Sequence, residues 1–151
     1  MRVRPFYWLV CAVMMIAWHG TPASALAKDS CRISVATILA SRDDRTIDPK
    51  LKKHIGELQS MFNYTSYRLL DGEHLTLDAG QSGTLSLPGD HQLNITLQNI
   101  RDDRADIALR MTKQSQSVFQ TNIQLLNRGN LFVGGPKYLN GNLIFKISSA
   151  F

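Results

Sequence analysis

The densest group of aromatic and basic side chains beyond the first 27 residues runs from Phe62 to Arg68, in the order Phe-Asn-Tyr-Thr-Ser-Tyr-Arg. Aromatic rings and guanidinium groups dominate the energetics of many interfaces, because rings stack and arginine donates several hydrogen bonds. If Tyr64 and Arg68 point outward from one strand face, they form a contact surface. Alternatively, Phe62 and Tyr67 belong to the core where a helix meets a sheet. The candidate binding residues in this segment are Tyr64, Tyr67 and Arg68.

A second candidate contact is the glycine-rich segment Val133-Gly134-Gly135-Pro136-Lys137-Tyr138. Its glycines have neither the fixed spacing nor the following helix of a phosphate-binding loop. A wide hairpin turn between the last strands explains the composition, and the tips of such turns often carry contacts. We therefore add Lys137 and Tyr138 to the candidate binding residues.

Catalytic signatures are weak throughout the sequence. Ser82 lies between glycines in Gly80-Gln81-Ser82-Gly83, and His74 and His91 are near it in the sequence. A nucleophilic serine of this kind needs a turn from a strand into a helix, whereas this segment is typical of a hairpin turn. We predict no catalytic residue and a chain that is not an enzyme.

Two groups of residues have some capacity to bind metal. His54 and Glu57 lie three positions apart on a predicted helix, but no third ligand accompanies them. Asp102, Asp103 and Asp106 offer carboxylate oxygens, yet neighbouring arginines oppose a cation and the spacing differs from the twelve-residue calcium loop. The sequence therefore predicts no metal site and no cofactor.

One short helix is predicted ahead of the aromatic segment. Asp48 is a suitable N-cap, and Pro49 suits the first helical position because its fixed φ matches a helix. Apolar residues then recur at helical spacing: Leu51, Ile55, Leu58 and Phe62. We expect a helix over about residues 49–62 that packs one face against a sheet.

The remainder of the chain is typical of short antiparallel strands. The segment 33–39 is β-branched, and from Tyr64 onward apolar and polar residues alternate almost to the end. Turn signals separate the runs: Asp71-Gly72, Ala79-Gly80, Pro88-Gly89-Asp90, Arg101-Asp102-Asp103, residues 127–130, and Asn140-Gly141. We predict a mainly β (α+β) fold, an antiparallel β-sandwich or small barrel of about 7–9 short strands.

Polar residues at alternating positions should form the outward face of these strands. They are Thr76, Thr84, Ser86, Asn94, Thr96, Gln98, Gln120, Asn122 and Gln124. Amides and hydroxyls on a rigid sheet could bind a glycan, although the aromatic platforms usual at sugar sites are missing. We prefer the simpler interpretation of a solvated face, because such alternation is expected of any half-buried sheet.

The N-terminus has the layout of a secretory signal peptide. Arg2 and Arg4 precede an apolar run over residues 6–18, and small residues follow over 21–27. The apolar run is too short for a retained membrane span. We predict cleavage before Lys28, which leaves one β-rich domain over 28–151, exported to the periplasm or the extracellular space. Only Cys31 remains in that domain, and we expect it to be buried at the start of a strand.

Charge argues against nucleic-acid binding. Loss of Arg2 and Arg4 with the leader lowers the formal net charge from +5 to +3. The remaining basic residues alternate with acids, whereas nucleic-acid binding needs a concentrated basic surface.

Three functions remain open for the exported domain. We expect a non-enzymatic envelope protein that acts as a protein-interaction or structural module, with another envelope protein or itself as partner. The first alternative is a small-ligand or glycan-binding sandwich. The second is a small outer-membrane β-barrel, because Phe151 at the end of an alternating strand resembles the C-termini of that class.

Overall fold

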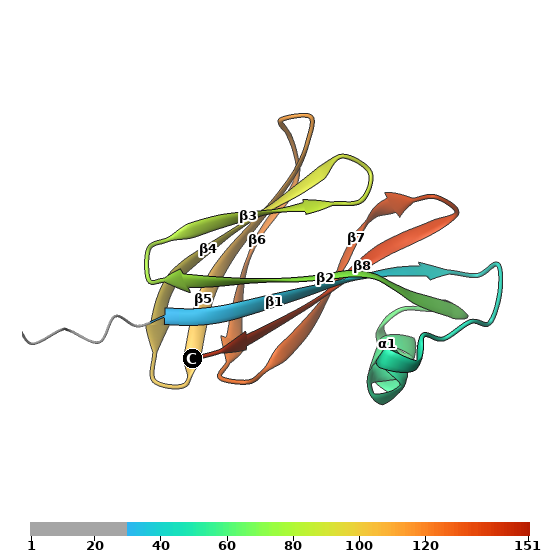
Figure 1. Ribbon diagram of the computed structural model, residues 1–151, viewed down its shortest axis with the longest axis horizontal. Helices are drawn as coiled ribbons and strands as arrows, with labels where there is room; N and C mark the ends of the chain where they lie inside the picture. Colours follow the sequence, from blue (N-terminus) through green and yellow to red (C-terminus); the bar gives the residue numbers. More distant parts are fainter. Residues whose placement is uncertain (1–29) are drawn as a thin grey trace, which may run out of the picture.

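The alternating segments form two four-stranded antiparallel sheets packed face to face (Figure 1). The structure is a computed structural model and describes residues 30–151. The strands are β1 (Ser30–Ser41), β2 (Ser66–Asp78), β3 (Ser82–Leu87), β4 (His91–Arg101), β5 (Arg104–Lys113), β6 (Gln116–Leu126), β7 (Asn130–Tyr138) and β8 (Gly141–Ala150). Sheet A has the order β2-β1-β8-β7, and sheet B has the order β3-β4-β5-β6. The predicted mainly β fold is confirmed, and the arrangement is a sandwich rather than a closed barrel.

The chain begins and ends in sheet A. It makes β1 and β2, crosses to sheet B for the meander β3 to β6, and returns for the β7–β8 hairpin. β8 lies between β7 and β1, with Val35 opposite Ile147. Sheet A therefore places the loops that follow β1, precede β2 and join β7 to β8 at one end of the sandwich.

The main core fills the space between the sheets. Sheet B contributes alternate residues such as Leu93, Ile95 and Ile107, and sheet A contributes Val35 and Phe145, all at most 2% exposed. Cys31 is also in this core, as predicted, and burial raises the pKa of its thiol. Removal of these apolar side chains from water is the principal force that holds the sheets together.

A second, smaller core lies on the outer face of sheet A, beneath the helical segment. Outward residues near the ends of three strands are apolar there, namely Ile38, Ala40, Phe132 and Ile144. Leu51 and Leu58 of the helical segment are 3% and 0% exposed against them. The amphipathic stripe read from the sequence is therefore the contact between helix and sheet.

The helical segment itself has two parts. A 3₁₀ helix, η1 (Pro49–His54), leads into α1 (Ile55–Met61), and the Asp48 side chain accepts a 2.9 Å hydrogen bond from the Lys50 amide. The predicted start and N-cap are confirmed, and the end is within one residue of Phe62. The difference is that the first turns are 3₁₀, a tighter helix common at helix N-termini.

Two expected turns are instead parts of strands. Asp71-Gly72 lies inside β2, where the pairing with β1 shifts register between Thr37 and Ile38. Gly134-Gly135 lies inside β7, also beside a register shift. A Cβ on Gly135 would lie 2.4 Å from Cε2 of Phe145, so this glycine lets an aromatic ring approach the backbone. These sequence signals thus mark strand irregularities and close packing.

The turn between β5 and β6 was not predicted from the sequence. Gln114 and Ser115 form it with φ values of 46° and 67°, a conformation that favours glycine or asparagine. The other predicted turns separate strands as expected. The predicted leader, residues 1–27, and the predicted new terminus at Lys28 lie outside the described residues.

Candidate functional site

Three loops meet at the end of sheet A that carries the helix. They are the segment after β1, the residues before β2, and the β7–β8 turn, which strand order brings together. Between them is an open cleft of about 460 Å³, here named the Tyr64 cleft. Its lining residues are Arg42, Asp43, Tyr64, Lys137, Leu139, Asn140, Gly141 and Asn142. Tyr64 and Lys137, candidates from two separate sequence segments, therefore share one site.

An aromatic ring and a cation form one wall of the Tyr64 cleft. The Arg42 guanidinium carbon lies 5.6 Å from the centroid of the Tyr64 ring, within the range of a cation–π contact. The Arg42 Nε also donates a 2.8 Å hydrogen bond to the carbonyl of Asn63. These two contacts hold the guanidinium beside the ring while Arg42 stays exposed.

The β7–β8 turn forms the opposite wall. The Asn140 side-chain amide donates to the Asp43 carboxylate and so ties this turn to the loop after β1. Leu139 at the tip is 76% exposed and has a φ of 52°. Lys137 is exposed, and among the described residues no carboxylate forms an ion pair with it. The cleft therefore offers an accessible cation and an exposed apolar side chain.

Arg68, near the start of β2, lies beside the loop that follows β1 but does not line the Tyr64 cleft. Its guanidinium forms an ion pair with the Asp44 carboxylate. The Ser66 hydroxyl, the Thr46 amide and this guanidinium lower the pKa of Asp44 to about 2. Arg68 thus helps to hold the loop after β1, although its side chain remains about half exposed.

The two remaining candidate residues point into the protein. Tyr67 is fully buried, and its hydroxyl donates a 2.6 Å hydrogen bond to the carbonyl of Phe62, the residue that ends α1. Burial raises the pKa of Tyr67. Tyr138 is half-buried against the main core, beside Gly89 of the β3–β4 turn. Both tyrosines can hold the segments around the cleft in place, whereas Tyr64 and Lys137 line the cleft and can contact a partner.

Several residues of the Tyr64 cleft were not predicted from the sequence. Arg42 and Asp43 belong to a charged loop that gave no local signal of a site. Leu139 and Asn140 adjoin the Asn140-Gly141 turn signal, which predicted the hairpin but not a role for it. Only the pairing of β1 with both β2 and β8 brings these segments together.

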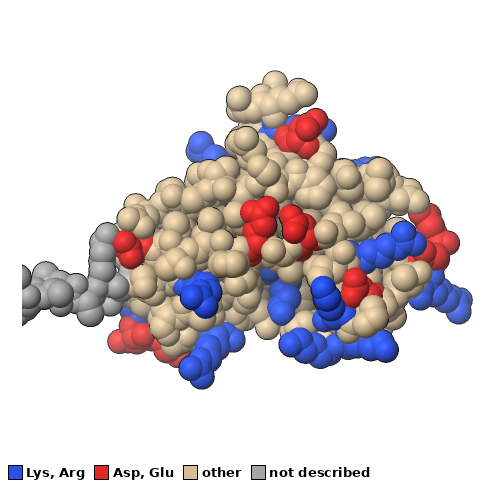
Figure 2. Space-filling model, viewed as in Figure 1, with Lys and Arg blue, Asp and Glu red and all other residues tan. Residues whose placement is uncertain are grey.

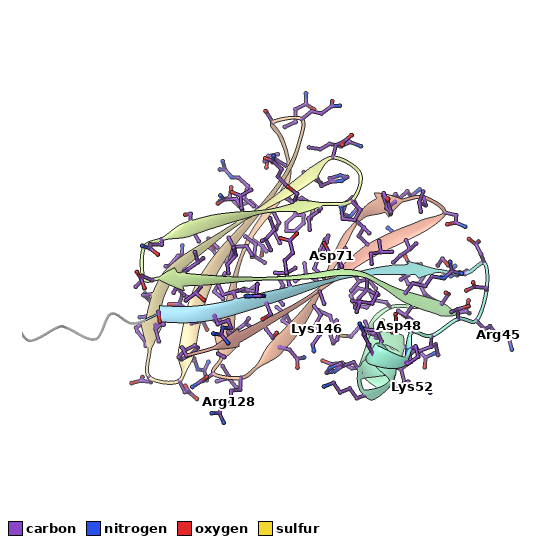
Figure 3. The ribbon with its side chains drawn as sticks, viewed as in Figure 1. Arg45, Asp48, Lys52, Asp71, Arg128 and Lys146 are labelled. Carbon is purple, nitrogen blue, oxygen red and sulfur yellow. The ribbon has the colours of Figure 1, made fainter. Side chains whose placement is uncertain are left out.

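His54 and Lys146 form an unusual pair beside the helical segment. The Lys146 Nζ lies 2.9 Å from the His54 Nε2, and the His54 ring contacts Phe132 edge-on at 5.9 Å. Burial, then repulsion from Lys146 and Lys53, lowers the pKa of His54. Burial also lowers the pKa of Lys146, which lies beside the helical segment in Figure 3. A neutral imidazole whose Nε2 accepts a hydrogen bond from the Lys146 ammonium fits this geometry.

The outer face of sheet B is polar and uncovered, as its alternation predicted. A shallow hollow of about 490 Å³ lies over it. Its polar side chains bond mostly to one another: Ser82 with Thr96, Asn94 with Thr84, and Arg110 with Gln120. Their hydrogen-bonding capacity is thus partly used within the sheet.

Charged side chains are unevenly spread over the molecule. Figure 2 shows Lys and Arg gathered at the end that carries the helix in Figure 1, with Asp and Glu among them. Arg45 and Lys52 point outward at this end (Figure 3). The Tyr64 cleft therefore lies at the end of the molecule where these charged side chains gather, and such charges can steer a partner of complementary charge.

Comparison with protein-family models, with curated proteins and with solved structures gives no match for the chain. Neither η1 nor α1 in the described part of the chain has the length and apolar character needed to cross a membrane. The function of the chain must therefore be inferred from its own geometry.

Proposed function

We propose that the chain is an exported, non-enzymatic module that binds another envelope protein through the Tyr64 cleft. The observation that supports this most is the combination of an aromatic face, two cations and an exposed leucine in one place. Arg42 and Tyr64 supply the stacking surface, and Lys137 and Leu139 face them. Such a combination suits an acidic peptide segment that carries an apolar residue.

The loops around the cleft are held in place before a partner arrives. Thr65 donates its hydroxyl to the Asp44 carbonyl at 2.6 Å, and the Tyr67 amide donates to the Thr46 carbonyl at 2.8 Å. Asn140 joins the β7–β8 turn to the same loop. Because these segments are already ordered, binding costs less conformational entropy than it would for free loops.

A matched pair of charge reversals tests the proposal. Wild-type protein, Lys137→Glu and Lys113→Glu are immobilised, and proteins retained from the native envelope are quantified by mass spectrometry. Lys113 is an exposed lysine at the far end of β5, so its reversal changes the net charge equally. We expect at least one acidic envelope protein to be retained by wild type and Lys113→Glu but lost from Lys137→Glu. Equal retention by all three would contradict the proposal.

Export is tested separately by the N-terminus of the protein isolated from its native source. Removal of the predicted leader yields a chain that begins at Lys28 and is recovered from the periplasmic or extracellular fraction. A protein that retains Met1 or Arg2 and stays in the cytoplasmic fraction would contradict export without affecting the cleft.

A glycan-binding role for sheet B is the second candidate. The hollow lined by Asn94, Arg110 and Gln120 supports it, because amide and guanidinium groups can bind sugar hydroxyls. A thermal-shift screen with envelope polysaccharides should then raise Tm for wild type and less for Arg110→Ala. Absence of a shift with every polysaccharide would remove this candidate.

A further inference from the structure

The sandwich has four edge strands, and three of them have features that discourage pairing. β3 has only six residues. β7 has an irregular register beside Pro136, and β2 carries Asp71 and Glu73 next to its own register shift. Short length, proline, charge and bulges all keep an edge from pairing with another chain.

β6 also has a register shift against β5, at Val118 near its start, but the strand is long and residues 119–125 pair regularly. Its eleven residues, Gln116–Leu126, include no charged residue, no proline and no glycine. Within residues 30–151 the strand pairs with β5 alone and forms the end of sheet B. In Figure 1 the β5–β6 hairpin also projects beyond the other strands at the top of the view.

We propose that β6 pairs with β6 of a second copy of this chain. The two strands run antiparallel about a two-fold axis at Asn122, so that Asn122 faces Asn122 of the second copy. Gln120 then faces Gln124 of the other chain, so the pairing uses the regular segment 119–125. The two sheets B become one continuous eight-stranded sheet.

The backbone of β6 has the orientation that this register requires. The Leu126 carbonyl accepts hydrogen bonds from the Gly129 amide at 2.8 Å and the Ser149 hydroxyl at 2.9 Å, away from β5. The Asn127 amide instead donates toward the β4–β5 turn, to the Asp103 carbonyl at 2.7 Å. Backbone groups alternate along a regular strand, so Gln120, Asn122 and Gln124 turn theirs toward the open edge.

That alternation makes Asn122 a suitable centre for the pairing. Residues that face each other across an antiparallel pair exchange two hydrogen bonds when their backbone groups point toward the partner. Asn122 would exchange both bonds with its symmetry mate. Gln120 would do the same with Gln124 of the second copy.

Side-chain polarity across the interface is also complementary. The Gln120 carbonyl oxygen accepts from Arg110 at 3.0 and 3.2 Å, which leaves its amide nitrogen as a donor. The Gln124 nitrogen donates to Asp106 at 2.8 Å, which leaves its oxygen as an acceptor. Placed opposite each other, the two glutamines complete a chain of donors and acceptors from Arg110 of one copy to Asp106 of the other, and the two-fold axis repeats it.

The apolar residues of β6 follow the same symmetry. Val118 and Leu126 are 44% and 50% exposed in the single chain. Both lie just beyond the regular segment 119–125, where the second copy partly shields them from water. The contact between two edge strands is small, so we expect a dissociation constant in the range of about 1–100 µM.

Sedimentation measurements over a wide concentration range test the dimer. Wild-type protein should change from monomer to dimer as its concentration rises. Asn122→Lys places two lysines opposite each other and should raise the dissociation constant at least ~100-fold. Gln92→Lys, on the same face of sheet B but on the inner strand β4, adds the same charge and should leave it unchanged.

A cysteine variant tests the register independently of any loss of stability. Asn122→Cys should form a symmetric disulfide-linked dimer under mild oxidation, because residues directly opposite in a sheet lie within disulfide distance. Val118→Cys, four residues from the two-fold axis, should cross-link much less. A wild-type monomer at all concentrations, a dimer that survives Asn122→Lys, or equal cross-linking of the two cysteine variants would overturn the proposal.

Discussion

The outer faces of the two sheets differ in what covers them. Sheet A turns apolar residues such as Ile38 and Ile144 outward at one end, and the helical segment covers them. Sheet B turns amides, hydroxyls and arginine outward, and these side chains bond to their neighbours in the sheet. The difference shows that the helix is required where outward positions are apolar. The covered end of sheet A is also the end that carries the Tyr64 cleft.

Truncation of one leucine beneath the helix and of one leucine on the outer face of sheet B should give the largest difference in the free energy of unfolding. Leu58→Ala removes a fully buried side chain between helix and sheet A, so we expect a loss of about 2–5 kcal/mol in the free energy of unfolding. Leu126→Ala removes a half-exposed side chain from sheet B and should cost less than about 1 kcal/mol. Urea unfolding of dilute protein measures both, and similar losses would show that the helix is not firmly packed.

Removal of one hydroxyl should have the next largest effect. Tyr67→Phe leaves the Phe62 carbonyl at the end of α1 without its 2.6 Å hydrogen bond, which should cost about 1–2 kcal/mol. Tyr138→Phe serves as the control, since no described residue forms a hydrogen bond with its hydroxyl, and its effect should stay within about 0.5 kcal/mol. Unfolding curves that rank the two variants in reverse would contradict this role for Tyr67.

Acid should weaken the covered side of sheet A through His54. Burial, Lys146 and Lys53 lower its pKa in the folded protein, while Glu57 partly opposes them. The pKa of this histidine in the unfolded chain is 6.5. As the pH falls below that value, the unfolded chain binds a proton before the folded protein does. The free energy of unfolding therefore decreases as the pH falls, until the pH is below the folded pKa as well. His54→Gln should flatten this dependence. Identical pH profiles for wild type and His54→Gln would refute the prediction.

A change on the uncovered face of sheet B should matter least. Arg110 is exposed, and its hydrogen bonds to Gln120 compete with water. Arg110→Ala should change the free energy of unfolding by no more than about 0.5 kcal/mol. A loss as large as that of Leu58→Ala would mean that the polar network, rather than the helix, stabilises the sandwich.

The sequence was sufficient to predict much of the fold because its signals are local. Asp48 and Pro49 marked the start of the helix, and alternation marked the strands and the polar face. Local signals were misleading where tertiary contacts decide the conformation. Asp71-Gly72 resembles a turn but continues β2, and Gly135 is needed because the Phe145 ring packs on it.

The candidate site was only partly predictable for a related reason. Tyr64 and Lys137 were identified in separate segments by residue type, but their proximity depends on the strand order of sheet A. Arg42 and Leu139 carry no local signal that distinguishes them from other loop residues. The burial of Tyr67 was one of two interpretations, and only the contacts of α1 with the sheet select it.

Amide hydrogen exchange, with and without the partner captured on wild-type protein, tests the central claim most directly. The account predicts that bound partner slows exchange at residues 42–45, 62–65 and 137–142, around the Tyr64 cleft. Exchange in β4 and β5 of sheet B should remain unchanged. Protection confined to the outer face of sheet B, with none around the cleft, would contradict the account.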